Sequence, residues 1–257
     1  MLTQYQTQTS QLLQNPAAPS PLYSTPLLTG YINTARGQLA GVEGKCVRVF
    51  GTLTITPGQR VYPFSNINFG TRATTGIAGV VALNQILFTV GSGQVWIRPR
   101  AWEWFLQYKL NNPTPQSGAI NVWAQYGQGA SPVPPSTGST TGSGGTLYVD
   151  PIPDFTYTLQ CDCTCYPQAL ASDTDIEAIP YPWTDAVPYF AAYLALLSSQ
   201  TSARMAEAPR YKELYTEFCA RARDASNPVE LQYIYQGAPD PVQAAKLGMS
   251  GGGRATQ

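Results

Sequence analysis

The sequence predicts an α+β fold: an antiparallel helical bundle formed by the N- and C-terminal helices, with an inserted β-rich domain and an extended C-terminal arm. Three observations support this. Apolar residues recur at helical spacing near both ends of the chain. In the middle of the chain apolar and polar residues alternate, as in strands. Gly and Pro interrupt the C-terminal stretch. We expect N-terminal helices in 1–44, the β domain in 45–170, C-terminal helices in 171–227 and the arm in 228–257.

The N-terminal part predicts two helices. Residues 2–14 form a short polar pattern with few apolar positions. In the second helix Thr25 is the expected cap, Pro26 the first helical residue and Gly41 the stop. Its apolar face is expected to meet those of the C-terminal helices, because neither pair has another apolar surface to cover. The expected bundle core comprises Leu28, Ile32, Leu39, Phe190, Leu194, Tyr215 and Phe218.

The middle of the chain changes to an alternating pattern. Residues 46–64 predict two strands joined by a turn at Pro57-Gly58, and residues 76–90 predict one or two more. A helical pattern returns at 98–113, and 120–127 predicts another strand. The stretch 127–145 is rich in Pro, Ser, Thr and Gly, which indicates a flexible exposed loop.

The stretch YTLQCDCTCYP, residues 157–167, concentrates three cysteines. A metal site or a redox centre is one interpretation, although structural zinc sites usually use Cys-x2-4-Cys pairs. Cysteine also behaves as a small buried hydrophobe, so a core strand is the other interpretation and the one we favour. Its apolar face would be formed by Phe155, Tyr157, Leu159, Cys161, Cys163 and Cys165, and its polar face by Thr156, Thr158, Gln160, Asp162 and Thr164.

Two helical patterns follow Pro182. The first has Thr184 as its expected cap and an apolar stripe of Val187, Phe190, Ala191, Leu194 and Leu197. The second runs from about Ser202 to Ala225 with a stripe of Met205, Ala208, Tyr211, Tyr215, Phe218, Cys219 and Ala222. The carboxylates Asp173, Asp175 and Glu177 precede both helices. Their spacing lacks the glycine and distal glutamate of an EF-hand, so we interpret them as a solvated turn.

The composition excludes several function classes. The chain has no histidine, so a Ser–His or Cys–His pair is impossible, and it contains no phosphate-binding glycine motif. No catalytic residue, cofactor or metal site is expected. Asp150 and Asp154 remain a weaker candidate for a glycosidase acid–base pair. No window approaches the ~18 apolar residues of a membrane span, and the opening residues lack a signal-peptide pattern, so we expect a cytosolic chain without a membrane partner.

Charge is scarce and unevenly placed. Charged residues make up 12% of the chain, the net charge is zero, and no charge occurs before Arg36 or between Leu110 and Val149. Nothing indicates the basic face of a free nucleic-acid binder. A surface this poor in charge is poorly soluble alone, which indicates cover by other subunits; an ordinary Thr- and Gly-rich β protein is the alternative.

The motif order resembles the head-to-tail adaptor (connector) proteins of short-tailed bacteriophages. The resemblance rests on LLTGYINTARGQLA (27–40), TLTITPGQRVYPF (52–64), LYVDPIPDFTYTLQC (147–161) and the paired helices after IPYPW (179–183). It covers about residues 2–227. The loop 127–145 and the cysteine strand depart from the family pattern.

The resemblance implies a structural virion protein at the head–tail junction, assembled in the host cytoplasm. It would form a ring of identical subunits, usually dodecameric, below the portal protein, close the filled head and dock the tail nozzle and fibres. Genomic DNA would pass through the ring without sequence readout. We further expect the arm to bind portal. Its candidate contacts are Leu231, Tyr233, Tyr235, Val242 and Leu247.

One alternative comes from a different class. Six aromatic residues crowd one segment and suggest a carbohydrate-binding or tail-spike accessory module, although a β-domain core with subunit contacts also explains them. They are Trp96, Trp102, Trp104, Tyr108, Trp123 and Tyr126.

Overall fold

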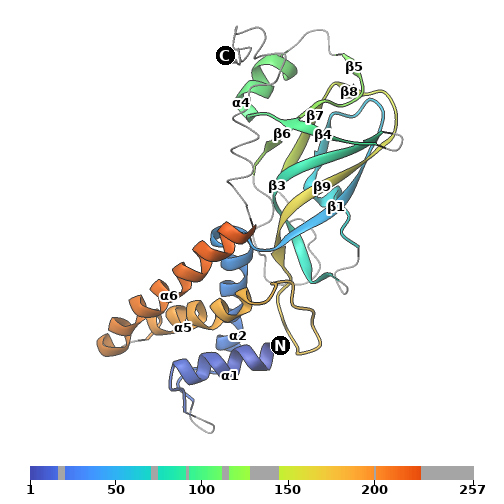
Figure 1. Cartoon of the computed structure of the whole chain (residues 1–257). Coiled ribbons are helices and arrows are strands. Elements are labelled where there is room, and N and C mark those ends of the chain that lie inside the picture. The colour runs from blue at the N-terminus through green and yellow to red at the C-terminus, as the bar shows by residue number, and fades with distance from the viewer. Residues whose placement is uncertain are drawn as a thin grey trace, which may run out of the picture.

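The computed structural model describes residues 1–16, 21–70, 75–90, 93–111, 116–127, 145–199 and 201–226. It confirms the mixed α+β class. Four long helices lie together at one end of the molecule and a curled sheet occupies the other, with α4 beside the end of the sheet that is far from those helices (Figure 1). The helices are α1 Leu2–Leu12, α2 Thr25–Gly37, η1 Gln38–Glu43, η2 Phe64–Asn66, α4 Trp102–Phe105, η3 Leu106–Leu110, η4 Trp183–Ala186, α5 Val187–Leu197 and α6 Ser202–Ser226.

Helix α5 is the centre of the helical part, because it packs against α1, α2 and α6. This position explains why its buried face is wider than one stripe: Ala192, Ala195 and Leu196 are buried as well as Phe190. The apolar stripe expected from the sequence for this helix included Leu197, which is not buried. Leu197 is 44% exposed because it lies at the last turn of the helix.

The residues expected to form the bundle core are mostly enclosed. Those buried are Leu28, Ile32, Leu39, Phe190 and Tyr215. Leu194 and Phe218 are half-buried against the same cluster. In α6 the expected stripe loses its first member, Met205, which is 45% exposed near the helix start.

The expected helix boundaries need three corrections. Ser24, not Thr25, precedes the first turn of α2, and Thr184 lies inside η4 rather than capping α5. Gly41 does not stop the second helix, which continues as η1 to Glu43. A Cβ on Gly41 would lie 2.5 Å from the ring of Tyr166. The glycine therefore permits close packing of η1 on the sheet.

The sheet curls through seven strands in the order β1-β9-β3-β4-β6-β7-β2, and β5 pairs separately with β8. Only β4–β6 and β5–β8 are parallel among the described pairs. The strands are β1 Arg48–Ile55, β2 Val61–Pro63, β3 Ile77–Val90, β4 Gly93–Pro99, β5 Ser117–Gly118, β6 Val122–Tyr126, β7 Thr146–Asp150, β8 Ile152–Pro153 and β9 Tyr157–Pro167.

The turn at Pro57-Gly58 is not a hairpin. Gly58 adopts a positive φ of 78°, as a turn requires, but β1 pairs with β9 and β2 pairs with β7. The turn therefore carries the chain between opposite ends of the sheet order. The Tyr62 hydroxyl secures this corner by donating to the carbonyl oxygens of Thr56 and Gln59 and accepting from the Thr56 N–H.

Strand β9 is the expected cysteine strand, and its core position is confirmed. It lies between β1 and β3, and Cys161, Cys163 and Cys165 are fully buried. Two details differ from expectation. Phe155 precedes the strand and is 67% exposed, and the supposed polar face is covered at Asp162 and Thr164. Both faces are enclosed there because β9 is an interior strand beside the helical part.

Two expected elements involve residues outside those described. The arm 228–257 and the loop residues 128–144 belong to this group.

Two expected elements of the middle of the chain take a different form. The helix expected at 98–113 is shorter and consists of α4 and η3. Residues 76–90, where one or two strands were expected, form the single strand β3.

Candidate interaction surfaces

A buried ion pair joins the helical part to the acidic turn before η4. Arg36 is fully buried, and its guanidinium donates to both carboxylate oxygens of Glu177 at 2.9 and 2.8 Å. It also donates to Asn33 Oδ1 at 3.2 Å and to the Gln168 carbonyl at 2.6 Å. The Tyr5 hydroxyl donates to Glu177 at 2.9 Å. One carboxylate thus ties α1 and α2 to the segment after β9.

The expectation of a solvated turn was therefore wrong for Glu177 and incomplete for its neighbours. Asp173 accepts from the Met1 ammonium group and from the Thr3 N–H and hydroxyl. Asp175 accepts from the N–H groups of Ser172 and Ala171. The Thr3 hydrogen bonds lower the pKa of Asp173, and the Ser172 N–H lowers the pKa of Asp175.

A second set of contacts joins the end of α6 to β1 and η1, and we call this junction the seam. Arg48 at the start of β1 pairs with the carboxylate of Asp162 in β9 and donates to the carbonyl of Ser226. Arg223 donates to the Glu43 carbonyl at 3.0 and 2.6 Å. Ser226, the last described residue, therefore lies beside the junction of helices and sheet. The proposed portal contacts, Leu231, Tyr233, Tyr235, Val242 and Leu247, lie beyond the described residues.

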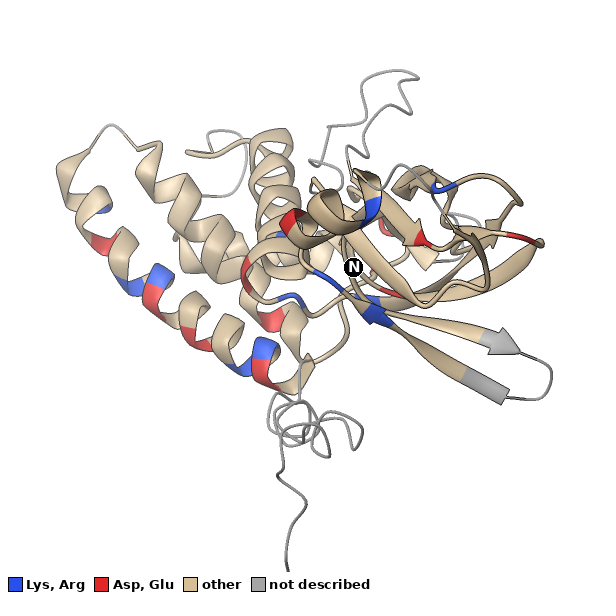
Figure 2. Cartoon of the chain, turned by 90° about the horizontal axis from the view of Figure 1, so that it is seen from above, with Lys and Arg blue, Asp and Glu red and all other residues tan. Residues whose placement is uncertain are grey.

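Exposed charge in the helical part is concentrated on α6. Acidic and basic side chains follow one another along this long helix, at the left in Figure 2. Helix α1 has no charged side chain, and the only one on α2 is buried Arg36. The exposed positions of these two helices are Thr3, Gln4, Thr7, Gln11, Thr25, Pro26, Leu27, Gly30 and Thr34. The molecule thus presents one charged helix and one uncharged pair.

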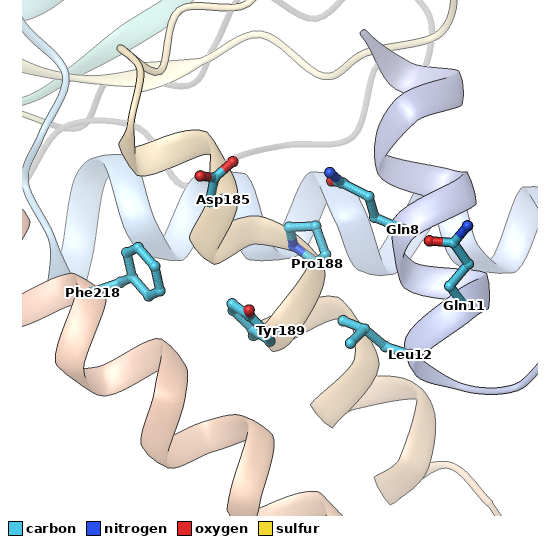
Figure 3. A pocket seen from close by; sticks show the side chains of 7 residues that line it. All are labelled: Gln8, Gln11, Leu12, Asp185, Pro188, Tyr189 and Phe218. Carbon is cyan, nitrogen blue, oxygen red and sulfur yellow. The ribbon is translucent and has the colours of Figure 1, made fainter.

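A pocket of about 470 Å³ lies between α1, α5 with η4, and α6 (Figure 3). The half-buried rings of Tyr189 and Phe218 stack with centroids 6.0 Å apart. Leu12 and Pro188 add further apolar surface, while the polar lining consists of Gln8, Gln11 and Asp185. The pocket was not anticipated, because its residues come from three helices that are separated in sequence.

The aromatic residues near α4 are largely engaged with their own neighbours. The Arg100 guanidinium carbon and Lys109 Nζ lie 5.0 and 5.9 Å from the Trp104 ring centroid. Tyr108 packs on Trp104, with centroids 5.6 Å apart. Trp102 packs on Phe105, Tyr126 and Tyr148. These contacts describe a partly exposed cluster rather than a flat, vacant platform.

The remaining aromatics of the expected set divide between inside and outside. Trp123 is buried and donates its indole N–H to the Ile97 carbonyl at 3.1 Å. Trp96 is 53% exposed on β4. Because the six residues do not form one surface, the sequence clustering did not translate into a single site.

The two aspartates considered for acid–base chemistry have other partners. Asp150 is buried and bridges Arg60 and Lys109, at 2.9 and 2.8 Å. Asp154 accepts a hydrogen bond from the Tyr157 hydroxyl. Both carboxylates therefore make structural contacts in the part of the molecule that holds the sheet.

The cysteine strand offers no reactive thiolate. Burial raises the pKa of Cys161 and of Cys165 to about 12, and raises that of Cys163 further. A raised pKa keeps the sulfur protonated and unreactive at neutral pH. Among the described residues no group of three or more Cys, Asp or Glu is arranged to hold a metal ion, and no helix is suited to cross a membrane.

Comparison with known proteins identifies one family. The family described as SU10 adaptor protein matches residues 2–232, nearly the whole chain. The match spans both the helical part and the sheet. It agrees with the resemblance found in the motif order. No curated protein matches the chain.

Proposed function

We propose that this chain, which belongs to the SU10 adaptor protein family, is the head-to-tail adaptor of a bacteriophage virion. In this role it forms a ring of identical subunits, a dodecamer, beneath the portal protein. The ring closes the filled head, docks the tail nozzle and fibres, and lets DNA pass through its lumen during ejection. The observation that carries the proposal is the family match over residues 2–232.

The uncharged exposed surface of α1 and α2 supports a contact between neighbouring subunits. The cores of protein interfaces are depleted in charged residues, because a buried charge must be desolvated and paired. The exposed positions of these helices carry threonine, glutamine and apolar residues only. We assign this surface to the ring contact and leave the charged face of α6 in water.

The helices and the C-terminal segment have separate parts in this proposal. The four long helices act as one antiparallel bundle that gives each subunit a rigid body, supported by the packing of α5 on α1, α2 and α6. The segment 228–257 acts as an arm toward portal, through Leu231, Tyr233, Tyr235, Val242 and Leu247. The end of α6 at Ser226 supports this assignment, because the described core is complete before the segment begins.

A structural role also agrees with the chemistry of the described residues. The candidate carboxylates are engaged in ion pairs and hydrogen bonds, and the thiols are buried. We therefore assign no enzymatic activity. The carbohydrate-binding alternative gains no support, because Trp102 and Trp104 are already packed against neighbouring side chains.

Light scattering of the full chain, with and without purified portal from the same phage, tests the proposal. We expect a monomer or loose oligomer alone and a ring bound to portal in the mixture, which negative-stain images would show directly. Failure to associate with portal would overturn the function. A stable ring without portal would overturn only the proposed order of assembly.

A further inference from the structure

The pocket between α1, α5 and α6 combines apolar surface with one carboxylate. Tyr189, Phe218 and Leu12 supply apolar surface, and the carboxylate of Asp185 lies at its edge (Figure 3). Asp185 is exposed, and its carboxylate has no hydrogen-bond or ion-pair partner within the part of the chain that the structure describes. An occupant that matches this groove combines apolar side chains with one adjacent cation.

The sequence after Ser226 contains one segment with this combination. The cations there are Lys246 and Arg254, and only Lys246 stands among apolar residues, in DPVQAAKLGM. Val242, Ala245 and Lys246 are spaced three and four apart, so a helical turn would place them on one face. Asp240-Pro241 is a pattern typical of a helix start.

We propose that residues 240–249 of the same chain dock in this pocket, with Val242 and Ala245 against Tyr189 and Phe218 and the Lys246 ammonium group beside Asp185. Two properties identify this segment as the occupant: its Lys246 complements the charge of Asp185, and its apolar residues Val242 and Ala245 lie on one side of a helical turn. Both the pocket and its occupant belong to one subunit. Because Val242 and Leu247 are also assigned to the portal contact, this docking describes the subunit before portal binds, and the segment must leave the pocket to reach portal.

The chain is long enough to reach. Phe218 precedes Ser226 by two turns of α6, which corresponds to about 12 Å along the helix axis. Residues 227–241 can extend to roughly 50 Å, so the segment can fold back to the pocket without strain. Tethering also gives the segment an effective concentration on the order of millimolar, far above micromolar protein in solution. Docking within one chain is therefore favoured over docking between chains.

Thiol crosslinking of the full chain tests the proposal, because the five native cysteines are buried and give little background. The test variant carries Gln11→Cys in the pocket and Ala244→Cys in the segment. The control carries Thr54→Cys, on an exposed position of β1, with the same Ala244→Cys. Both are treated with a short bismaleimide, and crosslinked peptides are quantified by mass spectrometry.

We expect crosslinking within one chain to be at least tenfold faster in the pocket variant than in the control. Asp185→Lys should slow it about threefold, and adding Lys246→Asp to that chain should restore the rate, because an exposed charge pair has an effect of this size. Equal rates in the two variants, or products that join two chains, would overturn docking by the chain's own segment. No response to the charge exchange would overturn the Lys246–Asp185 contact.

Discussion

Arg36 on α2 and Glu177 before η4 form a bidentate ion pair across 141 positions of sequence, and the arginine is fully buried. The pair lies where α1, α2 and the end of β9 meet, since Tyr5 and the Gln168 carbonyl complete it. It is therefore a buried polar contact between the first and last thirds of the described chain.

Glu177→Ala should lower the free energy of unfolding by about 3–5 kcal/mol, because it leaves the Arg36 guanidinium buried without its counter-charge. Urea unfolding measures the effect. Glu217→Ala is the matched control, since Glu217 pairs with Arg221 on the exposed surface of α6 and should change stability by at most about 0.5 kcal/mol. Equal effects of the two substitutions would contradict the assigned role of Glu177.

Gly41→Ala should destabilise the protein by about 1–3 kcal/mol, because the new methyl group would overlap the Tyr166 ring. Gly30→Ala in α2 is the control, since nothing lies within 4 Å of its Cβ position. That substitution should stabilise by roughly 0.5–1 kcal/mol through helix propensity. Thermal unfolding of the two variants distinguishes them by the sign of the shift, and a neutral Gly41→Ala would refute the close contact.

The thiols of Cys161, Cys163 and Cys165 should label slowly in the native protein and rapidly in denaturant. Their reactivity requires both access and ionisation, and burial opposes both. A maleimide time course at pH 8 measures this. Stoichiometric zinc in the purified protein would contradict the assignment of these residues to the core.

Three buried thiols, one of them Cys46 outside the cysteine strand, predict loss of stability in alkali. The pKa values of Cys46, Cys161 and Cys165 rise from 9.0 to about 12 on folding. Above pH 9 the unfolded chain therefore binds fewer protons than the folded chain, and the free energy of unfolding falls as pH rises toward 12. Urea unfolding at several pH values should show this decline, and Cys161→Ala should weaken its pH dependence. A stability that is constant from pH 9 to 11 would be inconsistent with these shifts.

Deletion of residues 227–257 should leave thermal unfolding nearly unchanged and abolish attachment to portal. The described helices and sheet make their core contacts before residue 227. Calorimetry and co-sedimentation with portal measure the two effects. A truncated chain that still joins portal as well as the full chain would assign the contact to the helical part instead.

Local patterns were sufficient to predict many of the individual elements of this fold, although not the strands β4 and β5. The cysteine strand and both C-terminal helices could be recognised because alternation or helical spacing is repeated over many residues. The pairing of β1 with β9 could not be recognised, since the turn at Gly58 fits a hairpin equally well. Pairing depends on partners that are about 110 residues away.

The interaction surfaces were harder to anticipate. Glu177 lies among exposed carboxylates, and nothing local distinguishes it until Arg36 and Tyr5 are brought beside it. The pocket has the same origin, because α1, α5 and α6 each contribute only part of its lining. The distribution of charge along the sequence was more informative about the surface than these local patterns. The stretch before Arg36, which has no charged side chain, spans α1 and most of α2, the two helices whose exposed positions are uncharged.

The contacts at Ser226 give a tension on the end of α6 a route into the sheet. Any tension on the C-terminal segment is applied at Ser226, whose carbonyl is held by Arg48 at the first residue of β1. From Arg48 the force continues into the paired backbone of β1 and β9 and through the Asp162 carboxylate. A pull directed along these strands loads their hydrogen bonds in shear, so that many must yield together. The seam thus connects the end of α6 directly to the sheet.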